Sequence, residues 1–248
     1  MFGRQMEAEL AIKFLLHTHP HVSEELEVLP IVGPGKVGKN TLVAHVCRDE
    51  RVRDHFSQIL LLHDLDFTND ELDTFREGCA MKHRDGMSNS SRDGRLLVVV
   101  ELEGELEEYA WNRLYSACKQ CMSNGSKIIV TSRSENIIKY GTTHAITLKY
   151  LSHEAYWYYF KTRVFGSTNP EAHPRLAPMA MEIARVLNGS FIGANVTALL
   201  LRDNLDIQLW CKVLAFLRGF VQKQLSTSGV HPVYLLNQNK PARIGRNG

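Results

Sequence analysis

One segment constrains this chain more than any other: Gly33-Pro34-Gly35-Lys36-Val37-Gly38-Lys39-Asn40-Thr41. An apolar run over residues 28–32 precedes it, and the apolar residues Leu42, Val43 and Val46 follow it. In such a strand–loop–helix context, backbone N–H groups and a helix N-terminus hold phosphate oxygens, and the lysine reaches the outer phosphates. Residues 33–41 are therefore predicted to form a phosphate-binding loop.

The loop departs from the usual pattern at Asn40, where a Ser or Thr hydroxyl would bind Mg²⁺. A hydrolase also needs an acid at the end of another strand, and the candidate strand is 96–101. Where an acidic pair is expected, the chain has Val100 and then Glu101. Both metal-handling positions are thus expected to be altered, with Mg²⁺ bound weakly or not at all. Glu101, or else Glu103, is either a catalytic carboxylate or a solvated acid.

Arg133 follows a buried strand predicted over 127–131. The position after such a strand lies near the carboxyl edge of a parallel sheet, where ligands bind. A planar, permanently charged guanidinium is suited to a terminal phosphate. The alternative, an arginine in an exposed loop, is equally compatible with the sequence.

Further elements are predicted from apolar patterning. Helices are expected over 6–16, 41–47 and 111–121, and strands over 27–32, 59–62, 96–101, 127–131 and 145–148. The run 59–62 is typical of a buried parallel strand, whereas Pro30 favours an edge position or an irregular start for the first strand. An irregular helix is expected over 67–82 and a surface loop over 84–94. Strands that alternate with helices predict an α/β fold, a parallel sheet with helices on both faces, over residues 1–150.

The pattern changes after Leu151 and stays helical to about Gln224. We expect a small helical subdomain over 151–224. From residue 225 to 248, Gly, Pro, Asn and basic residues dominate, which predicts a poorly ordered tail.

Composition excludes several classes of function. The formal net charge of +2 gives no excess that would attract nucleic acid, and the apolar runs are too short to span a membrane. The first residues do not resemble a signal peptide, so we expect a cytoplasmic protein. Five cysteines, an odd number, argue against a disulfide framework. No metal site is expected: Cys118 and Cys121 lack a second pair, and three histidines (His17, His19, His21) fit a solvated loop.

In sequence order, these pieces resemble a known family. They are Phe2-Gly3-Arg4-Gln5, the loop at 33–41, the strand 97–102 with Trp111 downstream, and the segments 125–133, 150–157 and 188–194. Together they resemble the NB-ARC domain of plant NLR (nucleotide-binding, leucine-rich repeat) disease-resistance proteins, from about Phe2 to Leu217. The resemblance implies an ADP/ATP-binding switch in which a P-loop NTPase sheet domain is followed by a helical ARC1 subdomain.

By position, the resemblance implies that Lys39 and the amides of Gly35 to Thr41 hold the phosphates. Arg133 would contact the outer phosphate, and Phe2 to Arg4 would line the adenine. The chain also departs from the family pattern. Lys36 stands where glycine is usual, and residues 189–193 lack the proline of the family's GLPLA stretch. No winged-helix subdomain, Met-His-Asp motif or leucine-rich repeat follows, so we expect a truncated, degenerate relative.

Three functions remain open. The first is an ADP- or ATP-binding module in plant defence with impaired hydrolysis. The second is a nucleotide-free pseudo-NTPase that acts as an interaction scaffold by pairing with full-length NLR proteins; Lys36 and the missing proline favour it. The third is a working ATPase, which Asn40 and Val100 oppose because phosphoryl transfer relies on Mg²⁺.

Overall fold

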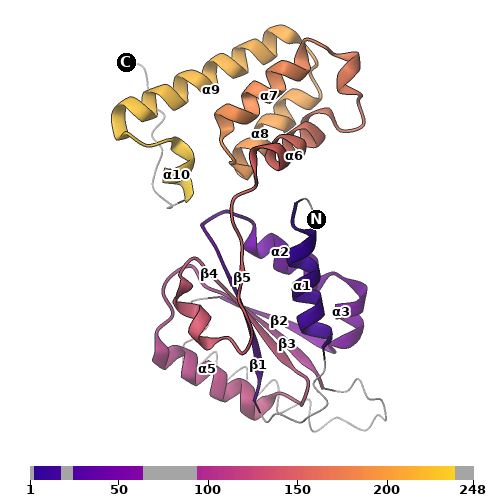
Figure 1. The fold of residues 1–248 in the computed structure, drawn as a ribbon, viewed down its shortest axis with the longest axis vertical. Coiled ribbons are helices and arrows are strands. Elements are labelled where there is room, and N and C mark those ends of the chain that lie inside the picture. Colours follow the sequence, from indigo (N-terminus) through magenta and orange to yellow (C-terminus); the bar gives the residue numbers. More distant parts are fainter. Residues whose placement is uncertain (1–2, 18–24, 64–93, 238–248) are drawn as a thin grey trace. The chain divides into compact units, whose positions relative to one another are not determined.

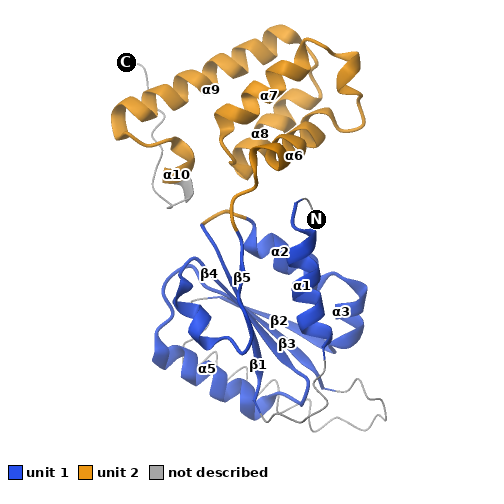
Figure 2. Ribbon diagram, in the orientation of Figure 1, with its two compact units in different colours: residues 1, 3–34, 38–148 blue, residues 2, 35–37, 149–248 orange. Residues whose placement is uncertain are grey.

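A computed structural model describes residues 3–17, 25–63 and 94–237 (Figure 1). The helix expected over 67–82 lies outside the described residues, as does all of the loop 84–94 except Gly94. The chain divides into two compact units (Figure 2), one of residues 1, 3–34 and 38–148 and one of residues 2, 35–37 and 149–248. Each unit is described separately below.

The described residues of the first unit form a five-stranded sheet in the order β2-β3-β4-β1-β5, in which every pair is parallel. The strands are β1 (Glu27–Val32), β2 (Gln58–His63), β3 (Leu96–Glu101), β4 (Lys127–Ser132) and β5 (Ile146–Thr147). All five lie where the apolar runs predict them. The predicted α/β class is therefore confirmed.

Helices cover both faces of this sheet (Figure 1). Side chains alternate along a strand, so Val98 and Val100 share one face. They join a buried cluster with Trp111 and Leu114 of α5 (Glu108–Cys121). On the other side, α1 (Gln5–Leu16) contacts α2 (Lys39–Cys47) and α3 (Glu50–His55). A short helix, η2 (Glu135–Tyr140), follows β4.

A buried lysine joins α1 to the start of the sheet. Lys127, on β4, is 1% exposed, and its Nζ donates to the carbonyl oxygens of Phe14 and His17, each at 2.6 Å. The same ammonium pairs with Glu27 Oε2 at 2.8 Å. It therefore satisfies carbonyls at the C-terminus of α1, where a cation also complements the helix dipole.

The edge position, one of the two alternatives given for the first strand because of Pro30, needs correction, and so does the burial expected for the run 59–62. Strand β1 is not the outermost strand, because β4 pairs along its whole length and β5 pairs at Ile31 and Val32. Pro30 is tolerated because its nitrogen faces the side where pairing with β5 has not yet begun. The run 59–62 is not a buried strand: β2 is at the edge of the sheet, and Leu61 is 53% exposed.

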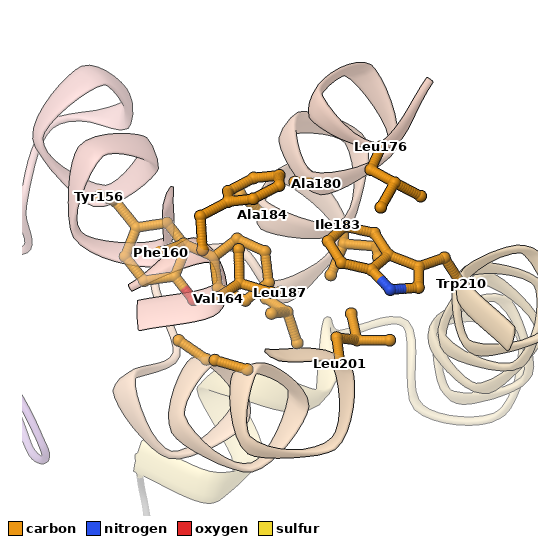
Figure 3. Close-up of a cluster of buried hydrophobic side chains, with 13 residues drawn as sticks. Tyr156, Phe160, Val164, Leu176, Ala180, Ile183, Ala184, Leu187, Leu201 and Trp210 are labelled. Carbon is orange, nitrogen blue, oxygen red and sulfur yellow. The ribbon is translucent and has the colours of Figure 1, made fainter. Parts of the chain in front are cut away.

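The second unit is helical. It consists of α6 (His153–Phe165), η3 (Pro170–Ala172), α7 (Leu176–Leu187), α8 (Phe191–Arg202), α9 (Ile207–Ser228) and α10 (Pro232–Asn237). Side chains of α6 to α9 meet in a single apolar core (Figure 3). Trp210, fully buried there, donates its indole N–H to the carbonyl oxygen of Asn204 at 2.8 Å. The hydroxyl of Ser152 caps α6 by accepting from the amide of Ala155.

The segment expected as a poorly ordered tail is partly helical. Helix α9 continues to Ser228 and ends at Gly229, which takes the left-handed conformation (φ 68°) typical of a helix C-terminus. Helix α10 follows over Pro232–Asn237. Residues 238–248 of the predicted tail lie outside the described residues.

Candidate nucleotide-binding site

The register of the sheet brings the candidate residues to one edge. Val32 pairs with Ser132, so the residues that follow them, Gly33 and Arg133, leave adjacent strand ends. Glu101 pairs with Thr131 on one side and with His63 on the other. The carboxyl ends of β1, β2, β3 and β4 therefore present Gly33, His63, Glu101 and Arg133 along the same edge, the usual ligand edge of a parallel α/β sheet.

The loop after β1 contains three residues with positive φ, namely Gly33, Lys36 and Gly38. Gly33 (φ 153°) admits no side chain, because a Cβ there would collide with the carbonyl oxygen of Leu148. Gly38 (φ 99°) occupies the N-cap of α2 in the left-handed region, which favours glycine. Lys36 also has a positive φ (58°), a conformation that the glycine usual at this position would adopt more readily. Within the described helix α2, the first turn itself holds no acidic residue.

Lys39 is folded back over its own loop. Its Nζ donates to the carbonyl oxygens of Gly33 at 2.7 Å and Pro34 at 2.9 Å, and the residue is only 8% exposed. Burial, with a second contribution from the charge of Arg133, lowers the pKa of Lys39 to about 8. An ammonium held among loop carbonyls beside another cation is well placed to bind an anion.

Arg133 directly follows β4, as the sequence predicts, and is half-buried. The positive charge of Arg133 disfavours protonation of Lys39 and is the second cause of its lowered pKa, after burial. Whether Arg133 contacts a terminal phosphate or lies in an exposed loop stays a prediction; its half-buried position and its charge near Lys39 are compatible with the first alternative.

The interpretation of Val100 as the altered metal-handling position is wrong. Val100 is fully buried and faces α5, on the side of the sheet away from α2, because side chains alternate along β3. The next residue, Glu101, points to the opposite side, where its Oε2 accepts a hydrogen bond of 2.7 Å from Asn40 Nδ2. Glu101 is therefore the acid opposite Asn40, and Leu102, the residue after it, is buried and apolar.

Glu101 has two further neighbours that sequence reasoning did not identify. His63 Nδ1 lies 3.7 Å from its Oε2. Burial, with a second contribution from the charge of Glu101, raises the pKa of the Cys47 thiol to about 11. Burial raises the pKa of Glu101, while the charge of a protonated His63 acts in the opposite direction. His63 is the last residue of β2, as Glu101 is of β3. The ends of the two predicted strands could therefore have identified His63 from the sequence.

The remaining predicted residues are placed as follows. Arg4 is buried at the N-terminus of α1, where its Nη1 pairs with Glu7 at 2.9 Å; Phe2 lies outside the described residues. Thr41 is exposed in the first turn of α2, and Gly35 and Val37 belong to the loop. Glu103 is exposed beyond β3.

Cys118 is buried against the sheet, and His19 and His21 lie outside the described residues. Among the described residues, no three His, Cys, Asp or Glu side chains gather as metal ligands.

The parallel sheet, the glycine-bounded loop and the lysine at the start of the following helix define a P-loop NTPase fold. Among models of protein families, that of the NB-ARC domain matches residues 11–169 of this chain. The chain belongs to the NB-ARC family.

Curated relatives are plant proteins. Disease resistance protein RGA2 of Solanum bulbocastanum is 26% identical over 223 residues, which cover 85% of this chain and 23% of that protein. The proteins named RGA1 and RGA4 of the same species are 27% and 29% identical and are matched over the same 85% of this chain. The chain thus spans about a fifth of the length of the curated relatives it matches, 22% in the case of RGA1.

Solved structures are more distant. Drosophila ORC bound to DNA is 13% identical, with a TM-score of 0.49, and is matched over 80% of this chain and 55% of that one. A STAND protein from Pyrococcus horikoshii with a tetratricopeptide repeat sensor is 16% identical, with a TM-score of 0.42, over 75% of this chain and 29% of that one. No helix formed by the described residues is long and apolar enough to cross a membrane.

Proposed function

We propose that this chain is an ADP- or ATP-binding module of the NB-ARC type with impaired hydrolysis, related to the switch domains of plant disease-resistance proteins. The observation that supports it most is the arrangement of Lys39, whose ammonium lies on the carbonyls of Gly33 and Pro34 and is close to the charge of Arg133. Two cations at a helix N-terminus form a site for the phosphates of a nucleotide. Gly33, Gly35 to Thr41 and Arg133 would hold the phosphates, and Phe2 and Arg4 would line the base.

Impaired hydrolysis is inferred from the carboxylates near the loop. Phosphoryl transfer to water needs one group that holds Mg²⁺ and another that orients the attacking water. Glu101 is the acid that faces α2, and it is hydrogen-bonded to Asn40. Because the following residue is the buried Leu102, Glu101 is the one carboxylate at the end of the described strand β3 that faces α2, and it would have to serve both roles. We therefore propose that Glu101 is not an efficient catalytic base.

A nucleotide-free scaffold that pairs with full-length NLR proteins is the second candidate. It is favoured by Lys36, which adds bulk and charge to the loop at a positive φ of 58°. Under either function we propose a cytoplasmic location and no nucleic-acid partner, given a net charge of only +2. A fluorescent fusion of the chain expressed in plant cells would test the location.

The test is to purify the chain, denature it, identify any released nucleotide, and then titrate ADP and ATP. Lys39→Ala should weaken ADP binding at least about tenfold, since it removes a charged contact with phosphate. Lys119→Ala is the matched control, because Lys119 is exposed on α5 and should leave affinity unchanged. An empty protein that binds neither nucleotide would exclude the first function and favour the scaffold. Rapid phosphate release from ATP would contradict the proposed impairment.

A further inference from the structure

The side chains of Asn40 and Glu101 join the start of α2 to the end of β3. The donor is Asn40 Nδ2, the acceptor is Glu101 Oε2, and they are 2.7 Å apart. In P-loop NTPases, the residue after the loop lysine and the acid at the end of another strand are the two protein groups that hold Mg²⁺. In this chain the groups at these two places bond directly to each other.

The chemistry of this pair does not fit Mg²⁺. A Ser or Thr hydroxyl can donate its proton to the acid while its oxygen lone pairs bind the ion. The Asn40 amide presents N–H to Glu101, and a nitrogen that donates in this way is not a metal ligand. Mg²⁺ requires oxygen ligands at close to ideal octahedral positions. With the amide on Glu101 Oε2, the pair offers the ion no hydroxyl oxygen from the loop and only the second carboxylate oxygen is not engaged by that amide.

The lengths of the Asn40 and Glu101 side chains also disfavour the binding of Mg²⁺ between them. The amide nitrogen of asparagine is one bond farther from Cβ than a threonine hydroxyl, and glutamate is one carbon longer than aspartate. Two longer side chains that meet at hydrogen-bond distance fill space that shorter ones would leave for a hydrated ion. The Glu101 side chain, 16% exposed, is also close to His63.

We propose that the Asn40–Glu101 hydrogen bond takes the place of Mg²⁺ between the phosphate-binding loop and β3, so that this chain binds its nucleotide without a divalent cation. The negative charge of the phosphates is then balanced by Lys39 and Arg133. This inference rests on the proposed function, and it makes Asn40 the residue that determines the cation requirement.

The experiment measures the dissociation constant of ADP for the full chain by calorimetry, in saturating Mg²⁺ and in excess EDTA. For the natural sequence the two values should agree within about twofold, a difference of less than 0.5 kcal/mol. Asn40→Thr restores a hydroxyl and frees the carboxylate, so Mg²⁺ should tighten its ADP binding about tenfold. The control is Asn112→Thr, the same substitution at an exposed position of α5, which should bind ADP as the natural chain does.

Each other outcome has a distinct meaning. If Mg²⁺ tightens the binding of ADP to the natural chain tenfold, which corresponds to about 1.4 kcal/mol, the inference is overturned. That result would indicate that Asn40 turns its carbonyl oxygen to the ion. A folded Asn40→Thr variant that shows no response to Mg²⁺ would refute the role assigned to Asn40. Failure of the natural chain to bind ADP in either buffer would instead refute the proposed function. The comparison in the natural chain decides the inference even if the variant does not fold.

Discussion

Raising the pH should weaken nucleotide binding through a single group, Lys39. Its pKa is lowered to about 8, first by burial and then by Arg133. About nine-tenths of the molecules therefore carry the Lys39 charge near pH 7, and about one-tenth carry it near pH 9. A bound phosphate stabilises the protonated form, so the proton must be taken up on binding above pH 8. The dissociation constant of ADP should then rise about tenfold between pH 7 and pH 9.

The assay is calorimetry of ADP binding in a pH series, with Lys39→Arg as the matched variant. Arginine stays protonated throughout this range, so the variant should show a flat profile even if its affinity is lower. The last phosphate proton is lost near pH 6, which leaves the charge of the ligand constant above pH 7. A flat profile for the natural chain, or an equal slope in Lys39→Arg, would refute the assignment of Lys39 to the phosphates.

The stability of the empty protein should change with pH in the opposite direction. The pKa of Lys39 falls from its ordinary 10.5 to about 8 in the folded chain. Between these two values the unfolded chain binds more protons than the folded one, so this group makes the folded state more stable as the pH rises. Weaker binding at high pH would therefore not be a consequence of unfolding at this site, and thermal melts over the same pH series provide the control.

Two substitutions in the sheet unit test the fold around the site. Val100→Asp places a carboxylate in the apolar cluster between β3 and α5 and should lower the free energy of unfolding by about 3–5 kcal/mol in denaturant titrations, whereas the isosteric Val100→Thr should cost less. A stable Val100→Asp protein in which Mg²⁺ tightens ADP binding would contradict the placement of Val100. Lys127→Met removes the ammonium shared by Phe14, His17 and Glu27 and should cost about 3–5 kcal/mol by the same measurement. An effect no larger than that of the exposed control Lys119→Met would refute the structural role of Lys127.

The positions of the strands follow from the sequence because a covered parallel sheet requires continuous apolar runs. How deeply each strand is buried does not follow, because it depends on the order of the strands. The run 59–62 is as apolar as 96–100, yet β2 is an edge strand and β3 is central. Pro30 illustrates the same limit: it indicates a side of β1 with incomplete strand pairing, and the two-residue β5 on that side pairs only with Ile31 and Val32.

The error at Val100 has a different physical origin. On a strand, an offset of one residue moves a side chain to the other face of the sheet. The sequence shows that an acid lies near the end of β3, but only the position of α2 shows which side chain of β3 faces the loop. Asn40 provides that information, because its amide bonds to Glu101, and Val100 lies on the far side with Trp111. The sequence predicts the loop, Lys39 and Arg133 because motif and spacing determine them locally, whereas the partner of Asn40 depends on packing.

The corrected geometry separates two functions that P-loop proteins usually combine. Under the proposed function, affinity for phosphate would depend on the loop, Lys39 and Arg133, which lie where β1 and β4 end. Metal binding depends on Asn40 and Glu101, which are bonded to each other. Because the two sets of groups are distinct, a change in the metal-binding residues need not remove the binding of phosphate. This separation is the basis of the proposal that the site retains a nucleotide rather than hydrolyses it: the cations would hold the phosphates while Asn40 and Glu101 are bonded to each other.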